Sequence, residues 1–239
     1  MQERYLGDIH DYFKFLFIKH LSIELNSKIG LNWFLVDPNK IGLKELEKND
    51  GERRSYLNNK LVNSFDKKII KELRKFRDIN KRKISLFTNH THLKEYINFF
   101  NKYIDFYNRD CWIKESLKHF KNEKIVFLDP DNGFSFKRKG RTTLKYVLPE
   151  DCKAYLSLGK IVIITQFQSF RLKNSDHLKN IINDLSKNDI RVSFPILRNR
   201  TAPNTFYITI TNKNNKIDFK KIYENYARKN FKVELINVL

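Results

Sequence analysis

Two carboxylates and an amide follow one another closely after a short apolar segment. Residues 124–128 predict a buried strand, and the chain continues directly into Asp-Pro-Asp-Asn-Gly, which begins at Asp129. Carboxylate oxygens at such a turn could ligate a cation, orient the amine of a ligand, or cap the next segment. Asp129, Asp131 and Asn132 are therefore candidate catalytic residues.

Asp37 is a further carboxylate at the end of an apolar segment, residues 32–36, which predicts another strand. Ligands of an open α/β sheet bind beyond the carboxyl ends of its strands, so the position of Asp37 favours a role in binding. Pro38 follows it, and an Asx-turn that only shapes the chain is an equal alternative.

Histidine and cysteine give little support to a metal centre. His90 and His92 have the His-x-His spacing of a chelating pair, but the sequence places no third ligand beside them. Cys111 and Cys152 form neither a zinc nor a redox motif, which predicts a reducing, cytoplasmic compartment. The longest apolar run, residues 161–164, is too short to span a membrane, so we expect no membrane association.

The strongest compositional signal is charge. The 239 residues include 47 Lys and Arg against 27 Asp and Glu, a formal net charge of +20. Such an excess attracts polyanions by counterion release and makes nucleic acid the leading partner, ahead of an anionic membrane surface or mere codon bias. The oligomeric state is left open. The residues expected to grip phosphates are Lys137, Arg138, Lys139, Arg141, Arg198 and Arg200.

Elements that could position these residues alternate along the chain. Hydrophobic periodicity predicts one domain, residues 1–239, with a possible helical lobe inserted at 43–80. Alternating strands and helices are typical of a three-layer α/β fold with a mostly parallel sheet, and the last two strands allow an antiparallel edge. The predicted helices span residues 8–26, 66–77, 92–106, 111–119, 150–158, 175–187 and 218–229, and the predicted strands span 32–36, 84–87, 124–128, 161–165, 191–197 and 205–211.

The order of these motifs resembles a known family. Residues 7–14, Gly-Asp-Ile-His-Asp-Tyr-Phe-Lys, are similar to the Gly-Asn-x-x-Asp-x-x-Lys motif of bacterial methyltransferases that modify the exocyclic amine of an adenine in large-subunit ribosomal RNA. Residues 35–37 resemble the end of their first strand, 109–111 a strand-end Asp-Gly, 128–131 their Asp-Pro-Pro-Tyr, and 190–207 their closing strands. The resemblance covers most of the chain and extends to uncharacterised bacterial proteins that share Asp-Pro-Asp-Asn-Gly.

The resemblance implies a Rossmann-like methyltransferase fold that binds S-adenosylmethionine and acts on RNA or DNA. It implies that Asp37 and Asp110 lie near the cofactor, with Asp110 against its adenine ring. Within the first motif, His10 and Asp11 would bind the cofactor and Lys14 would be a further catalytic residue in the same cleft. Asp129 would accept a hydrogen bond from the target amine and so position it.

Two other functions remain open from the residues. Asp129 and Asp131, joined by Glu150 and Lys145, could hold a divalent metal in a nuclease such as a restriction or defence enzyme. The chain could also be a non-catalytic protein that binds nucleic acid on a degenerate methyltransferase scaffold, because a fold does not dictate its chemistry.

Overall fold

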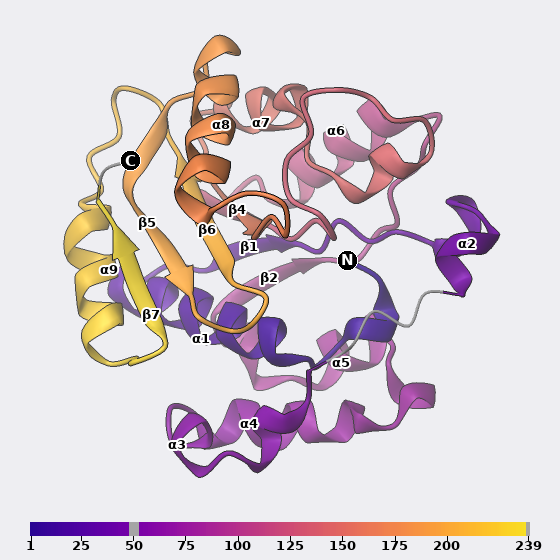
Figure 1. Ribbon diagram of the computed structural model, residues 1–239, viewed down its shortest axis with the longest axis vertical. Coiled ribbons are helices and arrows are strands. Elements are labelled where there is room, and N and C mark those ends of the chain that lie inside the picture. The colour runs from indigo at the N-terminus through magenta and orange to yellow at the C-terminus, as the bar shows by residue number, and fades with distance from the viewer. Residues whose placement is uncertain (48–52, 238–239) are drawn as a thin grey trace.

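The computed structural model describes residues 1–47 and 53–237, and it contains a seven-stranded mixed sheet (Figure 1). The strands are ordered β2-β1-β3-β4-β6-β5-β7 across the sheet. They span Ile29–Asn32 (β1), Ile97–Phe100 (β2), Ile125–Leu128 (β3), Ile161–Phe167 (β4), Val192–Asn199 (β5), Thr205–Ile210 (β6) and Val233–Ile236 (β7).

Strand direction divides the sheet into two parts. β2, β1, β3 and β4 are parallel, whereas β6, β5 and β7 each run antiparallel to their neighbour. Five of the seven strands therefore point the same way, and the three last strands form an antiparallel edge. This confirms the expected α/β architecture and is compatible with a Rossmann-like fold.

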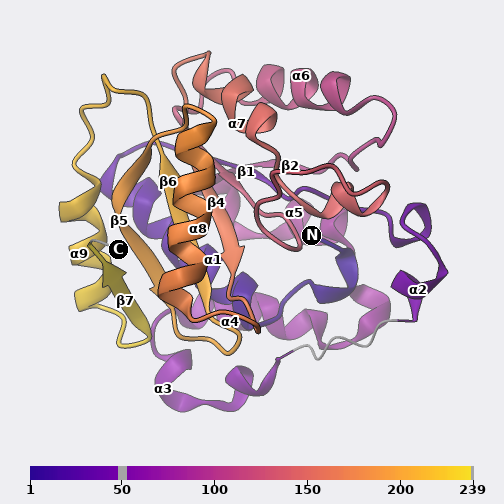
Figure 2. The ribbon, with the colours of Figure 1, turned by 45° about the horizontal axis from the view of Figure 1, so that its top comes forward.

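Helices cover both faces of the sheet (Figures 1 and 2). Alternation along β3 shows the two resulting cores: Ile125 and Phe127 pack with α1, α4, α5 and α9, while Val126 and Leu128 pack with α6, α7 and α8. The helices span Ile9–Glu24 (α1), Leu43–Leu46 (α2), Lys60–Asn63 (α3), Lys67–Leu73 (α4), Ile84–His90 (α5), Arg109–His119 (α6), Pro149–Leu156 (α7), Asn174–Lys187 (α8) and Phe219–Arg228 (α9).

α1 is the helix that matters most for the site. It begins after Asp8, whose side chain accepts hydrogen bonds from the backbone N–H groups of His10 and Asp11 and so caps the first turn. Phe13 and Phe17 on the same helix are fully buried in the core beneath the sheet. This packing fixes the first turn of α1 at one end of β3 and β4.

The segment between β1 and β2 differs from the expectation. Residues 84–87, predicted as a strand, form the start of α5, and residues 92–106, predicted as a helix, contain β2. The segment predicted as a strand at 32–36 begins where β1 ends, and β7 was not expected. The described part of residues 43–80 contains short helices separated by non-helical residues, and residues 48–52 of the expected lobe lie outside the described part.

No helix within the described residues is long and apolar enough to cross a membrane.

Candidate functional site

A cavity opens beyond the carboxyl ends of β3 and β4. The chain moves from β1 outward to β2 but returns to place β3 on the other side of β1, so the sheet has its switch point between β1 and β3. Asp129 lies at this point, and its N–H donates to the carbonyl oxygen of Asn32 at 3.0 Å. The cavity has a volume of about 580 Å³, within the range of small-molecule sites. Seven of the candidate residues line it: His10, Asp11, Lys14, Asp129, Asp131, Asn132 and Lys145.

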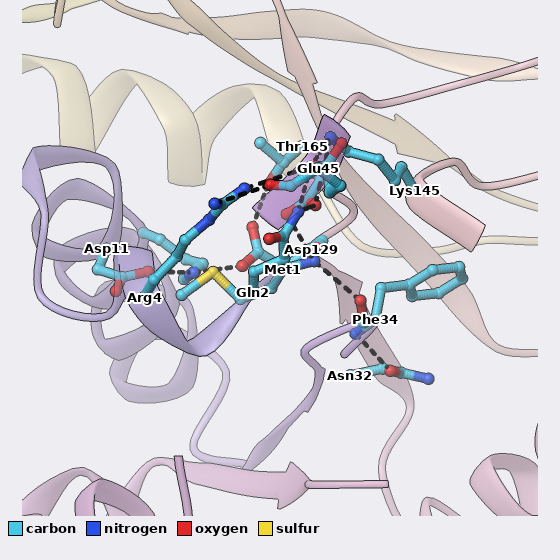
Figure 3. A network of polar contacts seen from close by, with 12 residues as sticks. Met1, Gln2, Arg4, Asp11, Asn32, Phe34, Glu45, Asp129, Lys145 and Thr165 are labelled. Atoms are coloured by element: carbon cyan, nitrogen blue, oxygen red, sulfur yellow. Dashed lines mark hydrogen bonds and ion pairs between the residues drawn. The ribbon is translucent and has the colours of Figure 1, made fainter. Parts of the chain in front are cut away.

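Lys14 is held between two carboxylates that line this cavity, those of Asp11 and Asp129, both labelled in Figure 3. Its Nζ donates to Asp11 at 2.6 Å and to Asp129 at 2.5 Å, and the lysine is only 2% exposed. Thr165, near the end of β4, donates to the second oxygen of Asp129 at 3.1 Å. The Lys14 ammonium also lies 4.6 Å from the ring centroid of Trp33. Helix α1 and strands β3 and β4 thus meet in one buried charge group.

The charges of this group shift one another's ionisation. Burial alone would lower the pKa of Lys14, but Asp11 and Asp129 outweigh it and raise that pKa above its usual value. Burial raises the pKa of Asp11, and the adjacent Lys14 counteracts part of the rise. Lys14 is therefore a fixed cation, which makes it a positioning residue and unsuited to release a proton near neutral pH.

Asp131 belongs to a second buried network, of which Met1, Gln2 and Glu45 are labelled in Figure 3. Its carboxylate lies 3.1 Å from the Met1 amino group and accepts from Gln2 Nε2 at 2.8 Å. Gln2 Nε2 also donates to Glu45, and Lys145 donates to the same Glu45 oxygen, each at 2.7 Å. Neither Gln2 nor Glu45 could be predicted as a site residue from the sequence, because their contacts join segments more than 40 positions apart.

Two residues of the first motif face the cavity with unusual ionisation. Burial lowers the pKa of His10 to about 4, so this histidine is neutral at pH 7. Its ring meets the edge of Phe167, with centroids 5.2 Å apart. Burial raises the pKa of Asp8 to about 6, against the opposing backbone hydrogen bonds from Asp11 and His10. Asp8 was not among the expected site residues, and only its capping position hinted at a fixed carboxylate.

Gln166 on β4 holds the turn that carries the acidic residues. Its Oε1 accepts from the N–H of Phe134 at 2.9 Å, and its Nε2 donates to the carbonyl oxygen of Phe167 at 2.9 Å. Gly133 has a φ of +82°, and a Cβ there would lie 2.1 Å from Gln166 Oε1. Glycine is thus required both by the backbone and by the close approach of this side chain.

The crevice expected to hold the cofactor is filled by the chain itself. The Met1 amino group donates to the carbonyl oxygens of Phe34 at 2.8 Å and Asp129 at 3.3 Å, and the Met1 carbonyl accepts from the N–H of Val36. Met1 and Gln2 are 7% and 1% exposed. The first residues of the chain therefore close the gap between the ends of β1 and β3.

The four residues expected to contact the cofactor are consequently separated. Only His10 and Asp11 line the cavity at Asp129. Asp37 lines a second cavity of about 450 Å³, beyond the first residues of the chain, and accepts from the N–H of Asn39 as in an Asx-turn. Asp110, expected at a strand end, is exposed in the first turn of α6 and lines neither cavity. S-adenosylmethionine does not fit this arrangement of residues.

Of the six basic residues expected to contact phosphates, five are exposed: Lys137, Arg138, Lys139, Arg141 and Arg200. Lys137, Arg138, Lys139 and Arg141 follow β3, and Lys139 lies 4.8 Å from the ring centroid of Tyr146, which lines the cavity. Arg200 follows β5 and donates to the carbonyl oxygen of Phe231, and Arg198 pairs with Glu234 at 3.0 Å. Because β3 and β5 point the same way, both groups lie at the edge of the sheet where the cavity opens, although none of these six residues lines it.

Among residues 1–47 and 53–237, no three His, Cys, Asp or Glu side chains gather as possible ligands of a metal ion. His92, one of the two histidines with chelating spacing, has its Nδ1 2.7 Å from Glu72.

Comparison with known proteins assigns the chain to no family, because neither a family model nor a curated protein matches it.

Proposed function

We propose that this protein binds nucleic acid and takes one base of it into the cavity at Asp129. The observation that carries the proposal is the separation of charge between the floor and the rim of that cavity. Asp8, Asp11, Asp129 and Asp131 line the cavity, where Lys14, Lys145 and the Met1 amino group pair with three of them. The exposed cations Lys137, Arg138, Lys139 and Arg141 lie instead on the loop that follows β3. Phosphates are attracted to the cations of this loop, whereas the paired charges of the cavity leave no excess of positive charge inside it.

The lining of the cavity suits a nucleobase. Tyr5, Phe134, Tyr146 and Phe167 supply aromatic surface on which a base could stack. The carboxylates on the floor are hydrogen-bond acceptors, and the amide of Asn132 is both donor and acceptor. These oxygens already accept from Lys14, Thr165 and Gln2, but a carboxylate oxygen can accept a second hydrogen bond, which the amine of a base could donate and a phosphate could not. This arrangement supports the hypothesis of a binding protein on a methyltransferase-like scaffold.

Methyl transfer is the second candidate. The position of Asp129, directly after β3 and beside β1, supports it together with the resemblance of residues 7–14 and 128–131 to the methyltransferase motifs. It requires residues 1–4 to leave the crevice, because they separate Asp37 from Asp129. Isothermal titration with S-adenosylmethionine tests this candidate. We expect no heat of binding, and a measurable heat would favour methyl transfer over binding alone.

Binding to a labelled oligonucleotide at increasing salt tests the main proposal. Neutralisation of about 4–6 phosphates predicts a slope of log affinity against log salt of about −3 to −5. Reversal of Lys137, Arg138 and Lys139 to Glu removes three cations from the rim, so we expect a slope flatter by about 2–3.

The matched control reverses three exposed lysines near the amino end of β3, at the opposite edge of the sheet: Lys118, Lys121 and Lys124. It should leave the slope close to that of the unmodified protein. Equal flattening in both triple variants would show that the rim of the cavity is not the phosphate contact. No binding even at low salt would overturn the proposed function.

A further inference from the structure

Phe170 is almost wholly exposed at the rim of the cavity. It lies in the loop between β4 and α8 and is 85% exposed, although it also lines the cavity. Burial of a phenylalanine is strongly favoured, so a ring presented to water at the entrance of a site calls for an explanation. Leu172, two residues further, is 46% exposed and belongs to the same loop.

The loop that carries Phe170 is held in shape by its own hydrogen bonds. Ser169 Oγ accepts from the N–H groups of Arg171 and Leu172 at 3.1 Å and 3.2 Å. At the base of the loop, Gln168 Oε1 accepts from the N–H of Asn204 at 2.9 Å, which ties it to the turn between β5 and β6. Phe170 thus lies on a turn that is fixed to two strands, and the conformation of this turn keeps its side chain exposed.

The charged residues around Phe170 favour nucleic acid as the binding partner that its ring contacts. Arg171 and Lys173 flank it and are exposed, and the basic residues 137–141 lie on the loop after the neighbouring strand. Phosphates gripped by these cations would bring the base stack against the ring. Apolar side chains that enter nucleic acid in this way part neighbouring bases, and the extra contacts offset the cost of unstacking.

We propose that Phe170 is a wedge that enters the base stack of a duplex and fills the space left by the base that moves into the cavity. This inference rests on the proposed function and adds a paired substrate to it. A ring that fills the gap slows the return of the base, so both affinity and the unstacked state depend on it. The chemistry is shared by duplex RNA and duplex DNA.

The test uses duplexes that contain 2-aminopurine, whose fluorescence rises when the base leaves the stack, in RNA and DNA versions. We expect the unmodified protein to raise the fluorescence of at least one of them. Phe170→Ala should abolish the rise and weaken duplex binding by about 5- to 150-fold, as for loss of a stacked aromatic. Leu172→Ala, in the same loop, is the matched control and should retain both properties.

The outcomes separate the two proposals. If the unmodified protein binds neither duplex nor single strands, the proposed function fails and the wedge fails with it. If it binds duplex but Phe170→Ala keeps the affinity and the fluorescence rise, only the wedge is overturned. Equal weakening of single-strand and duplex binding would also overturn it, because the ring would then be a stacking platform and not a wedge. The RNA and DNA arms show which duplex is bound.

Discussion

Replacement of Lys14 by methionine removes the cation between two buried carboxylates while keeping most of the side-chain volume. Asp11 and Asp129 would then remain 2% and 6% exposed without their nearest opposite charge. Loss of one partner from a buried ion pair costs about 3–5 kcal/mol of unfolding free energy. In a domain of this size, that corresponds to a fall in Tm of about 6–20 °C.

The measurement is thermal and urea unfolding of the variant beside a matched control. Lys19→Met breaks a comparable contact on the same helix, 2.6 Å from Asp66, but there the two side chains are 21% and 14% exposed. Solvent screens this pair, so we expect a cost of about 1 kcal/mol or less. Adding Asp129→Asn to Lys14→Met should restore part of the loss, because it removes one of the two stranded charges.

The pH dependence of Lys14→Met follows from the direction of the Asp11 pKa. That pKa already lies above 3.8 in the folded protein, and loss of the ammonium would raise it further. A carboxyl with a raised pKa binds its proton more tightly when folded, so stability is lost as pH rises through the folded pKa. The penalty should therefore shrink as pH falls from 7 towards the ordinary carboxyl range. A cost no larger than that of Lys19→Met, or one independent of pH, would refute the account of this buried charge group.

Two further variants test the remainder of the site. Gly133→Ala places a Cβ against Gln166 at a φ of +82°, so it should lower the unfolding free energy measured in urea by at least about 1–3 kcal/mol. Gly140→Ala is the control: its φ is +56°, a Cβ there would have nothing within 4 Å, and the loss should be smaller. For Asp8, a folded pKa of about 6 means that stability is lost as pH rises through 6. Asp8→Asn keeps a good helix cap and should flatten stability between pH 5 and 7; an unchanged profile would contradict the assignment.

Strong periodicity allowed most of the fold to be predicted. α1 and β3 carry unambiguous patterns, with apolar residues at helical spacing in one and a continuous apolar run in the other. The run at 84–87 was ambiguous by nature: Ile84 and Phe87 are buried, but Leu86 is 43% exposed, as on one face of a helix. A short apolar segment does not distinguish a strand from one helical turn without its neighbours.

The candidate site was predictable where it follows from strand ends. Asp129 and Asp131 could be found because they directly follow a buried strand, whereas Lys14 was expected only from the resemblance of residues 7–14 to a family motif. Glu45 and Gln166 were out of reach, since each acts through a partner more than 30 positions away. Met1 and Gln2 fill the crevice through contacts of the same long-range kind, which no local sequence pattern predicts.

The alternation of side chains along β3 couples the unfolding of the two helical layers. Its backbone hydrogen-bonds to β1 on one side and β4 on the other, and its side chains enter both cores in turn. Neither layer can detach without exposing one face of this strand, so the amide protons of Ile125–Leu128 exchange with solvent only when the whole domain opens. Their exchange free energy should equal the global unfolding free energy, and both layers should melt as one cooperative unit.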